Sequence, residues 1–243
     1  MRTAPTSVLD RRVVLETLAR VFDREGMMPR LSAVTQRLKA PAQVWLFGGA
    51  IRNAILSEKL DHYVPIRDLD FVVFNIEDDA LAKAFAPEAP RLNTFGGLKV
   101  TLEGLTVDIW RAELQWLIAG HAQPMARTIE AYLNCVTLTT DAVLYDVQRK
   151  ELQEQGFLRA MSERTIDIGA DSHWVEPWVP YHLAHLAYVR SLTNFEVGER
   201  ARSTVREVAT GGVIERAVQY LATGNKCDDP RRVVVTLVQH VRE

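Results

Sequence analysis

One segment constrains the fold more than any other part of the sequence: residues 47–74, which read FGGAIRNAILSEKLDHYVPIRDLDFVVF. An apolar run of strand type ends in Gly48-Gly49, a helical pattern follows, and a second apolar run opens with Asp68-Leu69-Asp70. Glycines between a strand and a helix let the backbone approach a ligand closely, and the free N–H groups at the start of the helix suit a triphosphate. The segment therefore predicts a strand–turn–helix–strand unit with a phosphate-binding turn.

The two aspartates at the start of the second strand predict a metal site. Asp68 and Asp70 stand at positions i and i+2, so both side chains point to the same face of a strand. Carboxylate oxygens suit Mg²⁺, with Mn²⁺ as the alternative, and metal between a triphosphate and an attacking hydroxyl is the two-metal arrangement for phosphoryl transfer. The best candidate for a third carboxylate is Asp108, because it lies in an otherwise largely apolar strand pattern, where an unpaired charge is costly to bury.

The apolar pattern divides the chain into an α/β part and an all-α part. Strands are expected at 44–47, 69–74, 99–102, 106–110, 133–138 and 142–146, and helices at 8–25, 31–39, 50–57 and 78–85. Strand signals vanish after Ser172, and the helices expected there cover 173–193, 199–209, 213–223 and 229–242. We therefore predict an α+β fold: a mixed sheet with flanking helices over residues 1–155, followed by a helical domain over residues 156–243.

Composition and charge narrow the class of protein. The 243 residues are 47% hydrophobic and 25% charged, as in an ordinary soluble protein. No apolar run approaches the roughly 20 residues of a spanning helix, and no secretory signal is visible, so a cytoplasmic protein with no membrane contact is expected. Cys135 and Cys227 are too few for a disulfide scaffold or a zinc site. The net charge of −2 means that any RNA-binding surface must be local, which argues against a processive polymerase acting on long RNA.

These motifs resemble class II tRNA CCA-adding enzymes and bacterial poly(A) polymerases, which belong to the DNA polymerase β superfamily of nucleotidyltransferases. The family opens with a pattern like GGxVRDxLL followed by DxD. Here the two patterns stand at residues 48–56 and 68–70, with Asn53 in place of the family Asp and a link a few residues longer. A family hairpin, F-G-x-V ending in a carboxylate, is similar to Phe95-Gly96-Gly97-Leu98 followed by Asp108, with tighter spacing.

The resemblance covers roughly residues 43–200 and implies the head and neck of those enzymes, with the head over 1–155 and a neck-like helical domain over 156–243. It implies a magnesium-dependent nucleotidyltransferase. The residues expected to act in catalysis and to hold the metal are Asp68, Asp70 and Asp108. The residues expected to bind the nucleotide are Gly48, Gly49, Arg52 and Asn134.

Two segments depart from the family at residues that bind the nucleotide. The family motif RRDFTINAL aligns with residues 128–136, where Asn134 is kept but both arginines are gone. The neck pattern beginning EDPLR aligns with Trp178-Val179-Pro180-Tyr181-His182, so the Glu-Asp pair and the arginine are replaced. In the family, the Asp and Arg of this segment read the base edge of CTP and ATP. The resemblance therefore implies that CCA specificity is lost or changed.

For two further pairs of side chains, the sequence leaves a choice between binding a ligand and a purely structural role. Arg52 and Arg67 flank the predicted site, and either suits a phosphate. Arg67 equally fits a solvated surface charge, so Arg52 is preferred. His182 and His185 stand at i and i+3 on a predicted helix, but no third ligand is apparent, so we expect them to pack rather than to bind metal.

We accordingly predict transfer of a nucleotidyl group from a nucleoside triphosphate to a hydroxyl, with release of pyrophosphate. The resemblance points to an RNA 3′ end as acceptor, while the acidic balance and the missing tRNA-gripping parts of the family leave a protein or a small molecule open. The alternative is a catalytically degenerate relative that binds a nucleotide, RNA or a protein. Retention of three carboxylates argues against that alternative.

Overall fold

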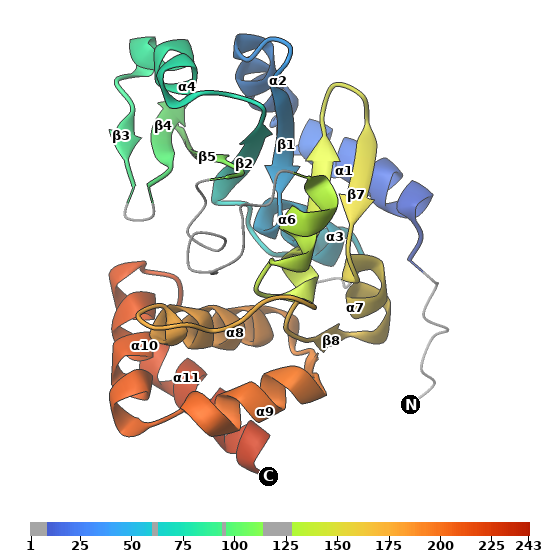
Figure 1. Cartoon of the computed structure of the whole chain (residues 1–243). Coiled ribbons are helices and arrows are strands. Elements are labelled where there is room, and N and C mark those ends of the chain that lie inside the picture. The colour runs from blue at the N-terminus through green and yellow to red at the C-terminus, as the bar shows by residue number, and fades with distance from the viewer. Residues whose placement is uncertain (1–8, 60–62, 94–95, 114–127) are drawn as a thin grey trace.

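The computed structural model describes residues 9–59, 63–93, 96–113 and 128–243 (Figure 1). Two amphipathic helices open this part of the chain, α1 (Arg11–Arg24) and α2 (Met28–Arg37). Asp10 caps α1 by accepting a hydrogen bond of 2.8 Å from the backbone N–H of Val13. Both helices contribute their apolar faces to the main core, through Val14, Leu18, Val21, Phe22, Leu31 and Val34.

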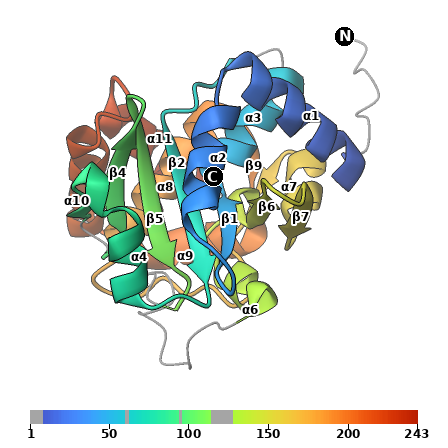
Figure 2. The ribbon, with the colours of Figure 1, turned by 90° about the horizontal axis from the view of Figure 1, so that it is seen from above.

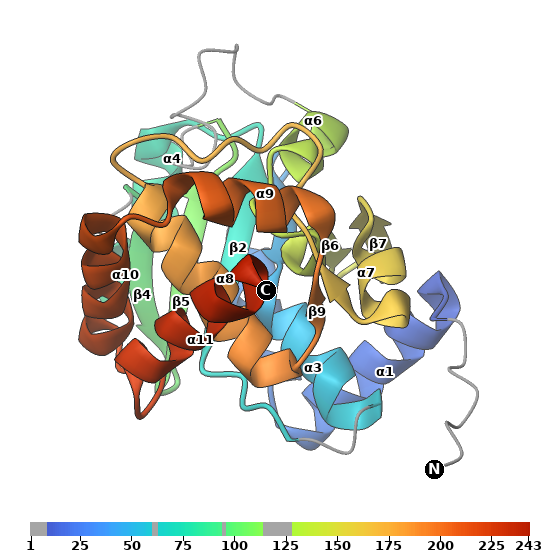
Figure 3. The same cartoon turned by 90° about the horizontal axis from the view of Figure 1, so that it is seen from below.

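The centre of the molecule is a seven-stranded sheet in the order β3-β4-β5-β2-β1-β6-β7. The strands are β1 (Gln43–Phe47), β2 (Asp68–Phe74), β3 (Arg91–Leu92), β4 (Leu98–Leu102), β5 (Leu105–Arg111), β6 (Val143–Asp146) and β7 (Glu151–Glu154). Neighbouring strands are antiparallel except β2 and β5, which run parallel. Figures 2 and 3 show the sheet passing from β4 on one side of the molecule to β6 and β7 on the other. This mixed sheet confirms the predicted α+β class.

Both faces of the sheet are covered, as the apolar runs of its central strands require. Along β2, Phe71 and Val73 join the main core, where α3 (Gly49–Lys59) also packs. Val72 and Phe74 point to the opposite face and join a smaller core with α6 (Ile129–Asn134). The alternation of β2 therefore assigns every odd-numbered residue to one face and every even-numbered residue to the other.

Most of the C-terminal part is helical, as predicted, and lies at one end of the molecule (Figure 1). Its elements are α7 (Phe157–Glu163), β8 (Thr165–Ile166), α8 (Val179–Thr193), β9 (Glu196–Val197), α9 (Glu199–Val208), α10 (Gly211–Thr223) and α11 (Pro230–Arg242). Thr210 and Asp229 cap α10 and α11 by accepting hydrogen bonds from backbone N–H groups of the first turn. Apolar residues of α8 to α11 join the same main core as the sheet.

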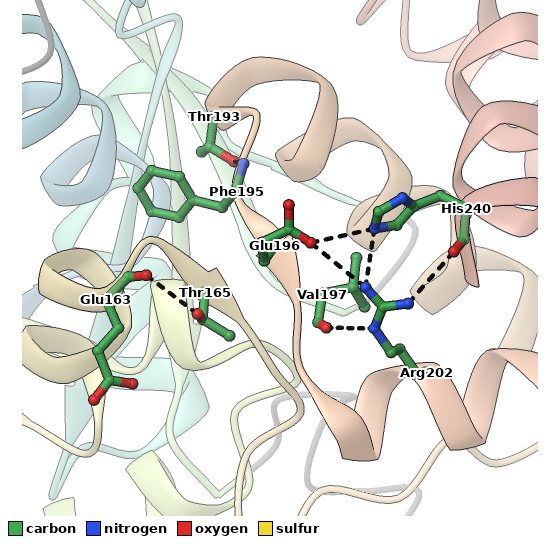
Figure 4. A network of polar contacts seen from close by, with 8 residues as sticks. All are labelled: Glu163, Thr165, Thr193, Phe195, Glu196, Val197, Arg202 and His240. Atoms are coloured by element: carbon green, nitrogen blue, oxygen red, sulfur yellow. Dashed lines mark hydrogen bonds and ion pairs between the residues drawn. The ribbon is translucent and has the colours of Figure 1, made fainter. Parts of the chain in front are cut away.

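The short parallel pair of β8 and β9 holds the start and the end of the α8 segment together. Asp167, directly after β8, accepts a hydrogen bond of 2.8 Å from the backbone N–H of Ala201 in α9. Arg202 of α9 donates a hydrogen bond of 2.9 Å to the Val197 carbonyl of β9. Its guanidinium also contacts Glu196 and His240, and the contact with His240 connects α9 to α11 (Figure 4). These polar contacts fix the geometry of the helical part around α8.

Several predicted elements differ from the observed ones. The strand expected at 133–138 is wrong: Thr128 caps α6 through the backbone N–H of Ala131, and the helix continues to Asn134 before a loop and the 3-10 turn η2 (Thr139–Asp141). The helix expected from 173 begins only at Val179, with Pro180 in its first turn. The elements without a sequence prediction include β3, β7, α7, β8 and β9, and β9 corrects the expectation of helix alone after Ser172.

The division between residues 155 and 156 stays a prediction. Within the described ranges, no helix is long and apolar enough to cross a membrane.

Candidate active site

The structure gathers the three predicted carboxylates on one face of the sheet. Asp68 and Asp70 flank Leu69, which is buried in the main core, so both aspartates point to the other face. Asp70 is paired in register with Asp108 on the neighbouring parallel strand β5. The residues on either side of Asp108 are also buried in the main core, so its side chain leaves the sheet on the same side as those of Asp68 and Asp70.

The electrostatic environment of Asp70 shows that this negative charge is poorly balanced. Burial, followed by the charges of Asp68 and Asp108, raises the pKa of Asp70 to about 8, while Lys226 and a hydrogen bond from Trp110 act in the opposite direction. A carboxylate such as Asp70, whose ionisation is opposed by neighbouring carboxylates, is a group whose repulsion a divalent cation relieves. The chemistry of these oxygen donors therefore fits Mg²⁺.

Asp108 has partners of its own. It accepts a hydrogen bond of 2.8 Å from Asn93 Nδ2 and forms an ion pair of 3.3 Å with Lys99 Nζ. In this arrangement no three His, Cys, Asp or Glu side chains of the described residues converge closely enough to hold one ion. The assignment of Asp68, Asp70 and Asp108 as metal ligands therefore stays a prediction.

The Gly-Gly turn forms as the sequence predicts, and its two glycines differ in role. Gly48 has a φ of +60°, a left-handed conformation that favours glycine, whereas a Cβ there would make only an ordinary contact of 3.4 Å with the Asp141 carbonyl oxygen. Gly49 begins α3 and lines the cavity described below. Phe95 of the predicted family hairpin lies outside the described residues. Gly97 of that hairpin is described, and a Cβ there would meet the Trp110 ring at 2.5 Å.

Arg52 lies in a buried network rather than free in the site. Its side chain is 3% exposed and its guanidinium forms an ion pair with Asp141. The second carboxylate oxygen of Asp141 lies 2.7 Å from His185 Nε2. Because an ionised carboxylate only accepts, that nitrogen carries the proton and donates. The network joins α3, η2 and α8, and whether Arg52 also contacts a phosphate stays a prediction.

The pKa values of the network follow from this arrangement. Burial opposes the ionisation of Asp141, but Arg52 and His185 together lower its pKa below the usual value. Burial lowers the pKa of His185 as well, against the pull of Asp141, so the ring is neutral at neutral pH. The sequence analysis missed Asp141, because its role depends on contacts with residues 89 and 44 positions away along the chain.

A cavity of about 930 Å³ lies between the aspartate face of the sheet and the helices α8 and α10. The predicted residues on its wall are Gly49, Arg52, Asp68, Asp70 and Asp108. Among the described residues, Asn134 is not part of the wall. Residues 136–138, a little further along the chain, line it. The helical side of the wall includes Tyr181, His185, Tyr188, Arg216, Tyr220 and Lys226.

The helical wall of the cavity is largely aromatic. The Tyr181 ring stacks on His185 with centroids 6.1 Å apart and meets Tyr220 edge-on at 5.8 Å. His182, which aligns with the family arginine, is buried instead: its Nδ1 lies 3.2 Å from Thr137 Oγ1 and its ring stacks on Trp174. The helical wall therefore offers rings for stacking at the surface of the cavity.

Of the comparisons with known proteins, the comparison with solved structures is the one that gives matches. No family model and no curated protein matches the sequence. The structure is similar to that of a CCA-adding enzyme in complex with CTP, with a TM-score of 0.65, 20% identity, and coverage of 93% of this chain and 54% of that chain. It is also similar to the Thermotoga maritima CCA-adding enzyme complexed with tRNA, with a TM-score of 0.61, 18% identity, and coverage of 93% and 53%.

A third match is a tRNA nucleotidyltransferase complexed with a primer tRNA and an incoming ATP analogue, with a TM-score of 0.58, 14% identity, and coverage of 89% and 60%. The chain thus spans 53% to 60% of the length of these three proteins. Identities this low establish the fold alone. Over nearly its whole length, the chain has the fold of the head-and-neck region of CCA-adding enzymes.

Proposed function

We propose that this protein is a metal-dependent nucleotidyltransferase, which transfers a nucleotidyl group from a nucleoside triphosphate to the hydroxyl of an RNA 3′ end. In this reaction the acceptor oxygen bonds to the α-phosphorus, the bond from that phosphorus to the bridging oxygen of the β-phosphate breaks, and pyrophosphate leaves. The proton of the acceptor hydroxyl passes to a nearby base or to water.

The observation that carries this proposal is the placement of Asp68, Asp70 and Asp108 on one face of two paired strands, at the wall of a cavity that also contains the start of α3. Like charges held close together, one of them on the buried Asp108, are costly unless a cation joins them. The start of a helix beside it suits phosphate oxygens. Negative side chains for a metal and a helix terminus for phosphates therefore meet in one cavity.

We assign the three carboxylates to two sides of the reaction, the triphosphate and the acceptor hydroxyl. Asp68 and Asp70 would hold Mg²⁺ or Mn²⁺ on the side of the triphosphate, and Asp108 would serve the side of the acceptor hydroxyl. A bound ion would neutralise phosphate charge and ease loss of the hydroxyl proton. The aromatic wall of Tyr181 and Tyr220 would hold the base by its face, which suits every base and discriminates weakly.

The acceptor assignment follows the solved structures of similar fold, whose proteins were captured with tRNA or with nucleotides. In those complexes the bound RNA is tRNA. For this chain we propose only the chemical class of the acceptor, the 3′ hydroxyl of an RNA.

One observation favours a second candidate, a relative that binds a nucleotide without transferring it. Asp108 is already held by Lys99 and Asn93, so the third carboxylate is not free for a metal in this arrangement. In such a protein the cavity would bind a nucleoside triphosphate, and the pair Asp68 and Asp70 alone would hold an ion.

Label transfer separates the two candidates. Each of the four α-labelled nucleoside triphosphates is incubated with Mg²⁺ or Mn²⁺ and with total cellular RNA and protein. A double variant, Asp68→Asn with Asp70→Asn, tests the site, and Asp23→Asn on the exposed face of α1 is the matched control. Label on RNA with the wild type and the control, but not with the double variant, supports transfer. Nucleotide binding with no labelled product under any condition supports the second candidate.

A further inference from the structure

Two cations at the cavity have no carboxylate partner among the residues that the structure describes. Among the described residues, five Lys or Arg side chains line the cavity. Three of them are in ion pairs: Arg52 with Asp141, Lys99 with Asp108 and Arg216 with Glu176. The other two, Arg67 and Lys226, are in no ion pair with any residue that the structure describes. A cation that lines a cavity without an anion is available to a ligand.

The two cations contact the same aromatic ring, that of Tyr188. Lys226 Nζ lies 5.6 Å from the centroid of the Tyr188 ring, and the guanidinium carbon of Arg67 lies 5.5 Å from the same centroid. Arg67 also donates hydrogen bonds to the Tyr188 hydroxyl and, at 3.4 Å, to the carbonyl of Asn225. Cation–π contacts place the charges, but two like charges on one ring repel each other until an anion joins them.

Both cations line the same cavity as the acidic cluster. Arg67 directly precedes Asp68 at the start of β2. Lys226 lies in the loop between α10 and α11, yet its charge reaches Asp70 and acts against the rise of that pKa, which burial and the neighbouring carboxylates cause. Positive charge therefore lies in the same cavity as the carboxylates that we assign to the metal. A polyanion bridging a metal and these cations would satisfy both sides.

A triphosphate has the charge and the length for this position. A lysine ammonium acts on phosphate as a compact point charge, and an arginine offers a planar fork of donors. Residues 128–136 contain no Lys or Arg, so this segment supplies no positive charge to a phosphate. We infer that Arg67 and Lys226 form a phosphate subsite that binds the triphosphate of the nucleotide. This inference rests on the proposed function.

Binding measurements test the subsite without requiring turnover. The full chain, with Mg²⁺ present, is titrated by calorimetry with each nucleoside triphosphate, with inorganic tripolyphosphate and with a short single-stranded RNA. The variants are Lys226→Gln, Arg67→Gln and the conservative Lys226→Arg. Lys83→Gln, on the exposed side of α4 (Asp78–Ala84), is the matched control. Thermal melting of each variant checks that the fold is intact.

We expect Lys226→Gln and Arg67→Gln each to weaken triphosphate and tripolyphosphate binding roughly tenfold or more, the usual effect of one charged hydrogen bond. Lys226→Arg should retain most of the affinity, and Lys83→Gln all of it. Wild-type binding that the two glutamine variants leave unchanged would overturn the subsite and leave the proposed function standing. A wild type that binds neither compound would overturn both. Loss of RNA binding alone would assign the two cations to the acceptor instead of the nucleotide.

Discussion

The Asp68–Asp70–Asp108 cluster and the Arg52–Asp141–His185 network lie on the same cavity and differ in how their charges are balanced. In the network, the two oxygens of Asp141 each meet a donor, and its pKa falls. In the cluster, Asp70 faces two other carboxylates, and its pKa rises to about 8. A carboxylate whose charge is matched inside the protein stabilises the fold, whereas one whose charge is unmatched is kept at a cost to stability and is expected to meet a ligand.

The largest expected effect concerns Asp70. Asp70→Asn should lower nucleotidyl transfer by roughly 10²–10³-fold or more, as loss of a charge-stabilising group does. Without metal, it should raise Tm by about 2–4 °C, since a neutral amide relieves the repulsion. The raised pKa means that the wild type loses stability as pH rises from about 4 to 8, so this gain should grow over the same range. Calorimetric melting in a chelator checks it, and a fall in Tm would make Asp70 a structural residue.

Asp141 should behave in the opposite way. Asp141→Asn leaves the guanidinium of Arg52 buried without its anion, and breaking such a pair costs about 3 kcal/mol or more. For a chain of this length, that corresponds to a fall in Tm of about 6–12 °C. Denaturant unfolding, with Asp23→Asn as the surface control, measures the loss. A change below about 1 kcal/mol would rank the network with ordinary surface pairs.

A smaller effect is expected from pH acting on His185. Because burial lowers its pKa, the unfolded chain takes up a proton below pH 6.5 that the folded chain refuses, and stability falls as the solution becomes more acidic. The lowered pKa of Asp141 adds a second loss below about pH 4. His185→Gln keeps a donor for Asp141 but does not titrate, so its denaturation midpoint should fall less between pH 7 and 5 than that of the wild type. Parallel curves for the two proteins would contradict the assignment.

The smallest effect should come from Lys99, which is 49% exposed and pairs with Asp108. Exposed pairs contribute up to about 1 kcal/mol, so Lys99→Gln should tighten Mg²⁺ binding by about two- to fivefold as Asp108 becomes available. Titration calorimetry with Mg²⁺ measures the change, with Lys83→Gln as control. Weaker metal binding in Lys99→Gln would instead show that Lys99 orients Asp108 for the ion.

The elements nearest the cluster could be predicted because their signals are local. The Gly-Gly turn and the alternation of Asp68 and Asp70 with Leu69 depend on positions a few residues apart, and the parallel register then brings Asp108 beside Asp70. Residues 133–138 were misread because a short apolar run fits a strand or a helix equally well, and the cap from Thr128 decided between them.

The rest of the cavity depends on contacts between distant parts of the chain. Asp141 stands in an ordinary-looking Thr-Thr-Asp turn, and Lys226 in a loop rich in polar residues. Neither position carries a periodic or motif signal, and each acquires its role only when α8 and α10 close over the sheet. The aromatic wall is similar: Tyr181 and Tyr220 lie 39 positions apart and meet only in the folded chain.

The β8–β9 pair has a mechanical consequence. The chain leaves the sheet side at Ile166, runs the length of α8 and returns to the same place at Glu196. Because the two ends of this segment are paired with each other, neither end can move away from the sheet without the other unless the β8–β9 pair breaks. The pair therefore limits how far Tyr181 of α8 can move from the carboxylates. Adjustment to ligands of different size is left to side-chain rotation and to the loop that carries Lys226.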